Sequence, residues 1–275
     1  MGDTMFRKSK LAKIFEDTQE FYSTNNVLKE NVKKLRANTK FYEADEYPVV
    51  TNNGNRLGTI TVTKSRTFEA AMRLDKEHVG KKIAVLNFAS ATTPGGGVVG
   101  GASAQEECLC RCSTLYPSID RRWLRDKYYN VNRTAHNPLY TDAIIYSPNV
   151  IICKTDEDFP VRMNDTNFVS VDVITCAAPN LSHVEKVSSD ELFDIHLRRA
   201  RHILQVAAAN GVDVLVLGAF GCGAFSNPPK IVATAYKIML EEFREFFDVI
   251  EFAIYCRDFE TENYTVFNEV MSSAQ

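Results

Sequence analysis

The sequence predicts an α/β fold in which a mixed β-sheet lies between layers of helices, and three observations support this. From residue 59 onward, short apolar segments typical of strands alternate with amphipathic segments typical of helices. Residues 82–88 and 212–217 are almost continuously apolar, as expected of central strands covered on both faces. Each of these strands is followed by a glycine-rich loop and then a predicted helix, an arrangement that places ligands at strand ends in open α/β sheets.

Residues 1–58 are predicted to form an N-terminal helical extension, and residues 59–275 the main domain. Two helices are expected in the extension from side chains that share a face, which are Leu11, Phe15 and Thr18 in the first and Val27, Asn31, Lys34 and Leu35 in the second. Residues 1–40 contain nine Lys or Arg against five Asp or Glu, an excess that we interpret as a solvated face. Turn-forming residues at 52–55 (Asn-Asn-Gly-Asn) mark the passage into the main domain.

The elements of the main domain follow in order along the chain. Strands are predicted at residues 59–63, 82–88, 143–145, 150–153, 169–175, 212–217 and 249–255. Helices are predicted at residues 68–74, 104–115, 190–210, 228–247 and 260–270. The short strands at 143–145 and 150–153 flank the segment Ser147-Pro148-Asn149.

The composition excludes several classes of protein. A formal net charge of -3 argues against a surface that binds DNA or RNA directly. No run of about 18 apolar residues is present, so neither a membrane-spanning helix nor a membrane partner is expected. The N-terminus lacks the apolar region of a secretory signal, and the seven cysteines form no disulfide-like framework. We therefore expect reduced thiols and a cytoplasmic location, or a nuclear one in a eukaryotic cell.

The first glycine loop follows the predicted strand at residues 82–88. It contains Gly95, Gly96, Gly97, Gly100 and Gly101, and a predicted helix begins just beyond it. Glycines let the backbone approach a ligand closely, and successive amides with a helix N-terminus behind them bind anions. The loop fits neither the Walker pattern nor the dinucleotide-binding fingerprint.

Glu106 and Glu107 fall in the first turn of the helix after this loop. Acidic residues there commonly do no more than complement the helix dipole. Directly after a glycine-rich loop at the end of a buried strand, however, the pair indicates an active site. Consecutive helical residues diverge by about 100°, so the two carboxyl groups are expected to have different roles.

At this point the sequence resembles a known family. Three glycines, a spacer of seven residues (98–104) and the run Gln105-Glu106-Glu107 are similar to the signature of poly(ADP-ribose) glycohydrolases. Two segments resemble the microbial branch in particular, which are NFASATTPGGG at residues 87–97 and Ser-Thr-Leu-Tyr at 113–116. The resemblance implies a macrodomain over residues 59–275 and hydrolysis of the ribose–ribose bond of poly(ADP-ribose).

The resemblance also implies roles for individual residues. Glu107 corresponds to the catalytic acid, and Glu106 to the carboxylate that orients the distal ribose. Asn87 takes the place of a polar contact to that ribose, and Gln105 belongs to the same signature and to the predicted ligand-binding set. The glycines that pack against the ribose and diphosphate are Gly95, Gly96 and Gly97. No cofactor or metal enters the scheme, and the histidines form no metal-binding pair.

The second glycine loop follows the predicted strand at residues 212–217. By itself it is no more than a turn between a strand and a helix. Its resemblance to the diphosphate-binding loop of macrodomains implies that Gly221, Cys222, Gly223 and Ala224 surround the diphosphate, and that Phe225 packs on the terminal ribose. We expect Cys222 to be a small loop residue and not a nucleophile, because no motif links it to a histidine.

Two other functions stay open at this stage. One is a binding module that holds ADP-ribose without cleaving it, against which the presence of both Glu106 and Glu107 argues. The other is a hydrolase that removes single ADP-ribose units. The expected partners are poly(ADP-ribose) or ADP-ribosylated protein, with ADP-ribose as the product. From the resemblance to microbial enzymes, we expect cleavage mainly from chain ends.

Overall fold

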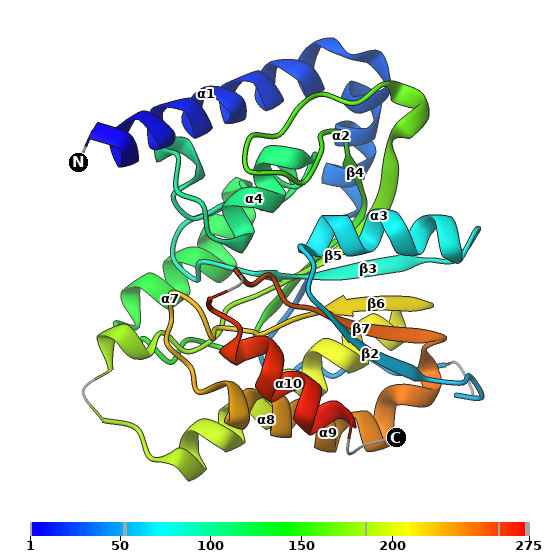
Figure 1. Cartoon of the computed structure of the whole chain (residues 1–275), viewed down its shortest axis with the longest axis vertical. Coiled ribbons are helices and arrows are strands. Elements are labelled where there is room, and N and C mark those ends of the chain that lie inside the picture. Colours follow the sequence, from blue (N-terminus) through cyan, green and yellow to red (C-terminus); the bar gives the residue numbers. More distant parts are fainter. Residues whose placement is uncertain (1, 52–53, 185, 258, 273–275) are drawn as a thin grey trace.

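The computed structural model describes residues 2–51, 54–184, 186–257 and 259–272. Within this part of the chain, a mixed sheet of seven strands crosses the molecule, with helices on both faces (Figure 1). The strand order is β1-β4-β5-β3-β6-β7-β2. The strands are β1 (Lys40–Tyr42), β2 (Thr59–Thr63), β3 (Ile83–Phe88), β4 (Ile144–Ile152), β5 (Val169–Cys176), β6 (Val214–Leu217) and β7 (Val249–Ala253).

Helices cover the two faces of the sheet unequally. One face carries three helices in the described residues, α8 (Ser189–Ala209), α9 (Pro229–Phe243) and α10 (Glu262–Ser272). The opposite face carries the other α-helices of the described residues and one π-helix, which are α1 (Gly2–Thr24), α2 (Asn26–Asn38), α3 (Thr67–Glu77), α4 (Gln105–Cys112), α5 (Tyr116–Ile119), α6 (Arg122–Leu124), the π-helix η2 (Arg125–Tyr129) and α7 (Asn130–Thr134).

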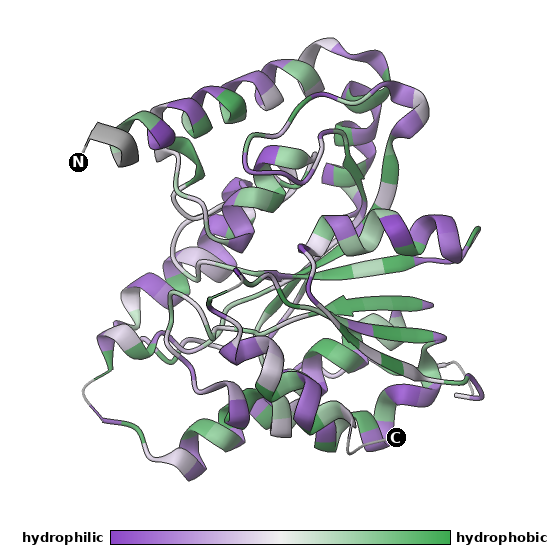
Figure 2. Cartoon of the chain, viewed as in Figure 1, coloured by the Kyte–Doolittle hydropathy of each residue, from purple (hydrophilic) through white to green (hydrophobic). Residues whose placement is uncertain are grey.

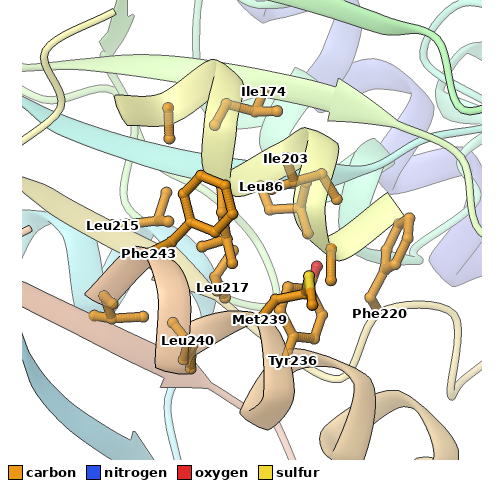
Figure 3. Close-up of a cluster of buried hydrophobic side chains, with 14 of the residues drawn as sticks. Leu86, Ile174, Ile203, Leu215, Leu217, Phe220, Tyr236, Met239, Leu240 and Phe243 are labelled. Carbon is orange, nitrogen blue, oxygen red and sulfur yellow. The ribbon is translucent and has the colours of Figure 1, made fainter. Parts of the chain in front are cut away.

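The sheet divides most of the core of the described residues into two large hydrophobic clusters, as this three-layer arrangement requires, and a third, small cluster joins Phe21, Leu28 and Cys153. On one face, Leu86 and Leu215 of the strands meet Ile203 of α8 and Met239 and Phe243 of α9 (Figure 3). The strands are almost uniformly apolar, whereas the helices alternate between apolar and hydrophilic residues (Figure 2). The predicted fold class, a mixed sheet between layers of helices, is confirmed.

The direction of the strands places the two glycine loops next to each other. Strand β3 pairs in parallel with both β5 and β6, and β7 pairs in parallel with β6 and β2. The carboxyl ends of all five strands therefore meet at one edge of the sheet. The loops after β3 and β6, which are neighbours, are the two glycine loops.

One strand prediction is wrong, because residues 143–145 and 150–153 do not form two separate strands. They belong to the single strand β4, whose register with β5 shifts between Ser147 and Val150. Pro148 has no N–H to donate to a ladder, and Asn149 has a left-handed φ of 58°. The Asn149 N–H instead donates to Asp172 Oδ1 at 2.7 Å, so the irregularity is held as a bulge within one strand.

The helix predicted at residues 104–115 is also shorter than expected. It ends at Cys112 because the next residues pair with β4: Ser113 forms a β-bridge with Ile152, and the Thr114 N–H donates to Ile151 O at 3.0 Å. The other predicted helices are present with small shifts of their ends.

The N-terminal residues pack closely on the rest of the chain. Leu11, Phe15 and Thr18 are buried, as their shared helical face predicts. Thr18 Oγ1 donates to Arg111 O at 2.6 Å, and buried Lys154 forms an ion pair with Asp17 at 2.6 Å.

Helix α2 and strand β1 differ from the sequence prediction in detail. Helix α2 buries Leu28 and Leu35, whereas Val27 is exposed. Residues 40–42 of the predicted extension form β1, an edge strand antiparallel to β4. Three residues are too few to show the alternation by which a strand is recognised in a sequence. Residues 52 and 53 of the predicted turn lie outside the described residues, and the division of domains at residue 58 stays a prediction. No helix in the described ranges is long and apolar enough to cross a membrane.

Candidate active site

The first glycine loop holds the side chain of Glu107 in place. The Gly97 N–H donates to Glu107 Oε1 at 2.9 Å. Gly96 has a φ of 56°, and a Cβ on it would lie 2.4 Å from the same Oε1 atom. Only glycine satisfies both the backbone angle and the space at this position. The close approach of the loop to the carboxyl group therefore depends on Gly96.

The second oxygen of Glu107 has no partner. The residue is 7% exposed, and its Oε2 atom is buried without a hydrogen bond in the described structure. Buried polar atoms are nearly always hydrogen-bonded, so an exception at the wall of a cavity indicates a place for a ligand atom. Glu107 thus presents one fixed oxygen and one available oxygen.

Glu106 has a different environment. Its Oε2 accepts from the Ser90 N–H at 2.7 Å, and its Oε1 accepts from Asn87 Nδ2 at 3.2 Å. The side chain is fully enclosed, and burial raises the pKa of Glu106 to about 8, with a smaller contribution from the nearby charge of Glu107. The two neighbouring carboxyl groups therefore differ, as their divergence on the helix predicts.

Two further residues from the sequence prediction, Asn87 and Gln105, hold Glu106 and the start of α4 in place. Asn87 lies buried at the end of β3, where Nδ2 also donates to Thr175 Oγ1 at 3.2 Å and Oδ1 has no partner. Gln105 accepts from the Phe88 N–H at 2.8 Å and donates to Leu86 O at 2.7 Å, which fastens the start of α4 to β3.

The raised pKa of Glu106 predicts a pH-dependent stability. Below pH 4.5 the folded and unfolded states both carry this proton; between 4.5 and about 8 only the folded state keeps it. The free energy of unfolding should therefore fall as pH rises through this window, by up to about 1.4 kcal/mol per pH unit from this group. Glu106→Gln removes the titration, and its amide can pair with the Asn87 oxygen that now has no partner.

Urea unfolding at about pH 5 and about pH 8.5 measures this effect. The Glu106→Gln protein should lose less stability than the wild type between the two pH values. Exposed Glu241→Gln on α9 is the matched control and should follow the wild type. Equal losses for all three proteins would show that Glu106 is ionised in the folded state throughout.

The second glycine loop is fixed by a buried pair that the sequence prediction missed. Asn227 donates to Pro179 O at 2.7 Å and to Gly221 O at 3.0 Å, and its Oδ1 lies 2.8 Å from His196 Nε2. Burial lowers the pKa of His196 to about 4, so the neutral ring donates to Asn227. Gly221 has a φ of 76°, and a Cβ there would lie 2.5 Å from Ala178 Cβ. His196 and Asn227 are 31 residues apart, and no motif joins them.

Within this loop, the thiol of Cys222 is shielded from solvent and the ring of Phe225 lies near another aromatic ring. Burial raises the pKa of the Cys222 thiol to about 12, which agrees with a small loop residue and not a nucleophile. The ring of Phe225 lies 6.4 Å from that of Tyr140, a residue with a φ of 57°. Buried Arg199 holds this segment by donating to Tyr140 O at 2.9 Å and to Ala177 O at 2.8 Å. Tyr140 is a second residue of the site that was not predicted from the sequence.

A cavity of about 850 Å³ lies between the two loops. It is lined by predicted site residues from both, which are Gly96, Gly97, Gln105, Glu106, Glu107, Gly221, Gly223, Ala224 and Phe225. Asn87, Gly95 and Cys222 lie behind this lining and do not form part of it. Tyr140 and Asn180 complete one wall, and the Asn180 Oδ1 atom is buried without a partner. The size suits a nucleotide-like ligand.

The second loop contributes Gly223, Ala224 and Phe225 to the lining of this cavity. The backbone N–H groups of Gly223, Ala224 and Phe225 donate to no other group in the described part of the chain. Adjacent amides of this kind bind anions. The cavity thus combines a glycine loop that has unpaired amides with a pair of carboxyl groups that differ in environment.

Comparison with known proteins agrees with this geometry. A family model described as the catalytic domain of microbial-type PARG, or poly(ADP-ribose) glycohydrolase, matches residues 24–155. The crystal structure of poly(ADP-ribose) glycohydrolase from Deinococcus radiodurans in complex with ADP-ribose is 36% identical over 88% of this chain and 97% of that chain, with a TM-score of 0.79. The chain belongs to the poly(ADP-ribose) glycohydrolase family.

Another glycohydrolase, from Thermomonospora curvata, superposes with a TM-score of 0.83 at 29% identity and covers 94% of this chain and 98% of that one. The same enzyme bound to the inhibitor ADP-HPD gives a TM-score of 0.81 at 30% identity, with the same coverage. No match was found among curated protein sequences. The predicted macrodomain fold, family and enzyme class are confirmed.

Proposed function

We propose that the chain hydrolyses the ribose–ribose O-glycosidic bonds of poly(ADP-ribose), with Glu107 as the catalytic acid, and releases ADP-ribose. The observation that carries this proposal is the buried Oε2 atom of Glu107, which has no partner at the wall of a nucleotide-sized cavity. The presence of both carboxyl groups argues against a module that only binds ADP-ribose.

The mechanism follows from what the bond requires. An alkoxide is a poor leaving group, so a carboxylic acid must protonate the departing oxygen while the distal ribose becomes oxocarbenium-like. With Oε1 held by the Gly97 N–H, Glu107 can present Oε2 to that oxygen. After the bond breaks, the Glu107 carboxylate accepts a proton from the water that attacks the anomeric carbon.

Glu106 serves to orient the distal ribose in this proposal. Its carboxyl group is held by Ser90 and Asn87 and lines the cavity beside Glu107. Burial raises the pKa of Glu106 to about 8, which favours the neutral form of this carboxyl group in the empty site. Asn87 lies behind Glu106, so we assign it the positioning of that carboxyl group and not direct contact with the ribose.

The diphosphate is assigned to the free amides at Gly223, Ala224 and Phe225, with the Phe225 ring against the terminal ribose. The ADP-ribose complex of the Deinococcus enzyme supports a ligand of this class. A diphosphate held here stabilises the cationic transition state. The scheme uses no metal or cofactor, so a chelator should leave turnover unchanged.

Cleavage from chain ends is expected from the position of α1. Arg7 and Leu11 of this helix line one end of the cavity, and the Lys8 carbonyl lies so close to Gly101 that a Cβ there would approach it to 1.9 Å. A helix seated in this way limits the passage of an internal segment of polymer. Release of long internal fragments would contradict this expectation. The cytoplasmic location stays a prediction.

One assay separates the polymer-cleaving function from removal of single units. Free ADP-ribose is measured by mass spectrometry after incubation with poly(ADP-ribose) and, side by side, with mono-ADP-ribosylated protein. We expect rapid release from the polymer and slow release from the mono-modified protein. Faster release from the mono-modified protein would make the chain a mono-ADP-ribosyl hydrolase, and no release from either would make it a binding module.

A further inference from the structure

We propose that a row of arginines, Arg133, Arg125, Arg122, Arg121 and Arg36, binds the part of the poly(ADP-ribose) chain that lies beyond the scissile bond. This arginine row is an anion-binding surface outside the cavity. The inference rests on the proposed function, because its ligand is the remainder of the same substrate.

The row begins at the mouth of the active site. Arg133 of α7 donates a hydrogen bond to the carbonyl oxygen of Thr92, which lines the cavity in the first glycine loop. Arg125 donates to Asp120 at 2.7 Å, close to Tyr116. The Tyr116 ring packs against Gly95, where a Cβ would meet it at 2.8 Å.

The row then follows one continuous helical segment, residues 122–134. This segment consists of α6, η2 and α7, and buries Leu124, Tyr128, Tyr129 and Asn132. Arg122, Arg125 and Arg133 are on its exposed side. Residues three apart are neighbours on a helix, so Arg122 and Arg125 lie together. With a rise of 1.5 Å per residue, the segment extends the charged surface by roughly 17 Å away from the cavity.

The far end brings two guanidinium groups together. Arg121 donates to Arg36 O of α2 at 3.2 Å, and burial together with the charge of Arg36 lowers the pKa of Arg121. Within the described residues, no ion pair joins Arg36, Arg121, Arg122 or Arg133 to a carboxylate. Neighbouring cations without carboxylate partners repel each other, and a bound anion relieves that repulsion.

The charge of this surface is opposite to that of the whole chain. Residues 116–134 contain five Lys or Arg and two Asp, a net charge of +3, whereas the chain carries -3. Each unit of poly(ADP-ribose) carries a diphosphate, so the polymer is a strong polyanion. Trp123, 36% exposed beside Arg122, adds an aromatic surface on which a base can stack. Charge complementarity and continuity with the active site both favour the polymer as the ligand.

The test compares long polymer with the shortest cleavable substrate, two linked ADP-ribose units. The variant Arg36→Gln with Arg122→Gln removes two charges from exposed positions of the row. We expect KM for long polymer to rise roughly 5- to 10-fold near physiological salt. The slope of log KM against log salt should fall by about 1.4, from about 0.7 for each lost phosphate contact. Turnover of the two-unit substrate and the Kd for ADP-ribose should be unchanged.

The matched control removes two charges elsewhere, with Lys13→Gln on α1 and Lys76→Gln on α3, both exposed. It should behave as the wild type, and the Arg36→Lys, Arg122→Lys protein should recover most of the long-polymer affinity. Equal KM changes in the glutamine variant and the control, or equal losses on both substrates, would overturn the proposal. Cleavage of labelled polymer should be inhibited more strongly by unlabelled poly(ADP-ribose) than by single-stranded RNA of equal charge. Equal inhibition by the two would also overturn the proposal. If the wild type itself releases no ADP-ribose, the proposed function fails instead.

Discussion

Replacing Glu107 by Gln should lower turnover on poly(ADP-ribose) by about 10²- to 10⁴-fold, the usual contribution of a general acid. The glutamine keeps the shape of the side chain, and its oxygen can still accept from the Gly97 N–H. It has no acidic proton to deliver to the departing oxygen. Initial rates of ADP-ribose release, with substrate above KM, measure this effect.

Binding should survive this substitution, since the diphosphate amides of the second loop are untouched. Calorimetry should give a Kd for ADP-ribose within a few-fold of the wild type. Glu241→Gln, an exposed change of the same kind on α9, serves as the control and should keep full turnover. Wild-type turnover in the Glu107→Gln protein would remove Glu107 from the mechanism.

Replacing Gly96 by Ala should lower turnover by about 10²-fold, because it displaces the same carboxyl group. The added Cβ would lie 2.4 Å from Glu107 Oε1, and the φ of 56° is unfavourable for alanine. The carboxyl group must then move by about an ångström, a displacement that can cost two orders of magnitude in rate. Steady-state kinetics on polymer measure the loss, which should appear in kcat.

Gly100 in the same loop provides the control. A Cβ at Gly100 would meet nothing within 4 Å, so Gly100→Ala should keep nearly full turnover. Equal losses in the two variants would indicate that the loop must be flexible in general, and not that Gly96 makes room for Glu107. Near-wild-type turnover in Gly96→Ala would mean that the Gly97–Glu107 contact is not needed for catalysis.

Much of the site could be predicted because its residues are close together in sequence. Gly96, Gly97 and Glu107 lie within twelve residues, and a loop between a strand and a helix brings them into contact. The place of the second glycine loop was predictable for another reason. The carboxyl ends of parallel strands lie at one edge of the sheet, which brings both loops together there.

The residues that the sequence did not reveal act across long separations. Asn227 and His196 meet only after α8 and the second loop have packed together, and neither stands in a motif. Tyr140 reaches the cavity wall because Arg199, 59 residues later, fixes its backbone. The pKa of Glu106, raised to about 8, depends on complete burial, which no local pattern encodes. The bulge at Asn149 likewise depends on Asp172 of the neighbouring strand.

The most direct measurement of the role of Glu107 uses a leaving group that needs no protonation. ADP-ribose bearing a p-nitrophenoxy group at the anomeric carbon of the distal ribose departs as a stable phenolate. If Glu107 is the acid, the Glu107→Gln protein should lose about 10-fold or less on this substrate, against about 10²- to 10⁴-fold on polymer. Equal losses on both substrates would contradict the central claim that Glu107 is the acid, and would leave it only the activation of water or the positioning of the ligand.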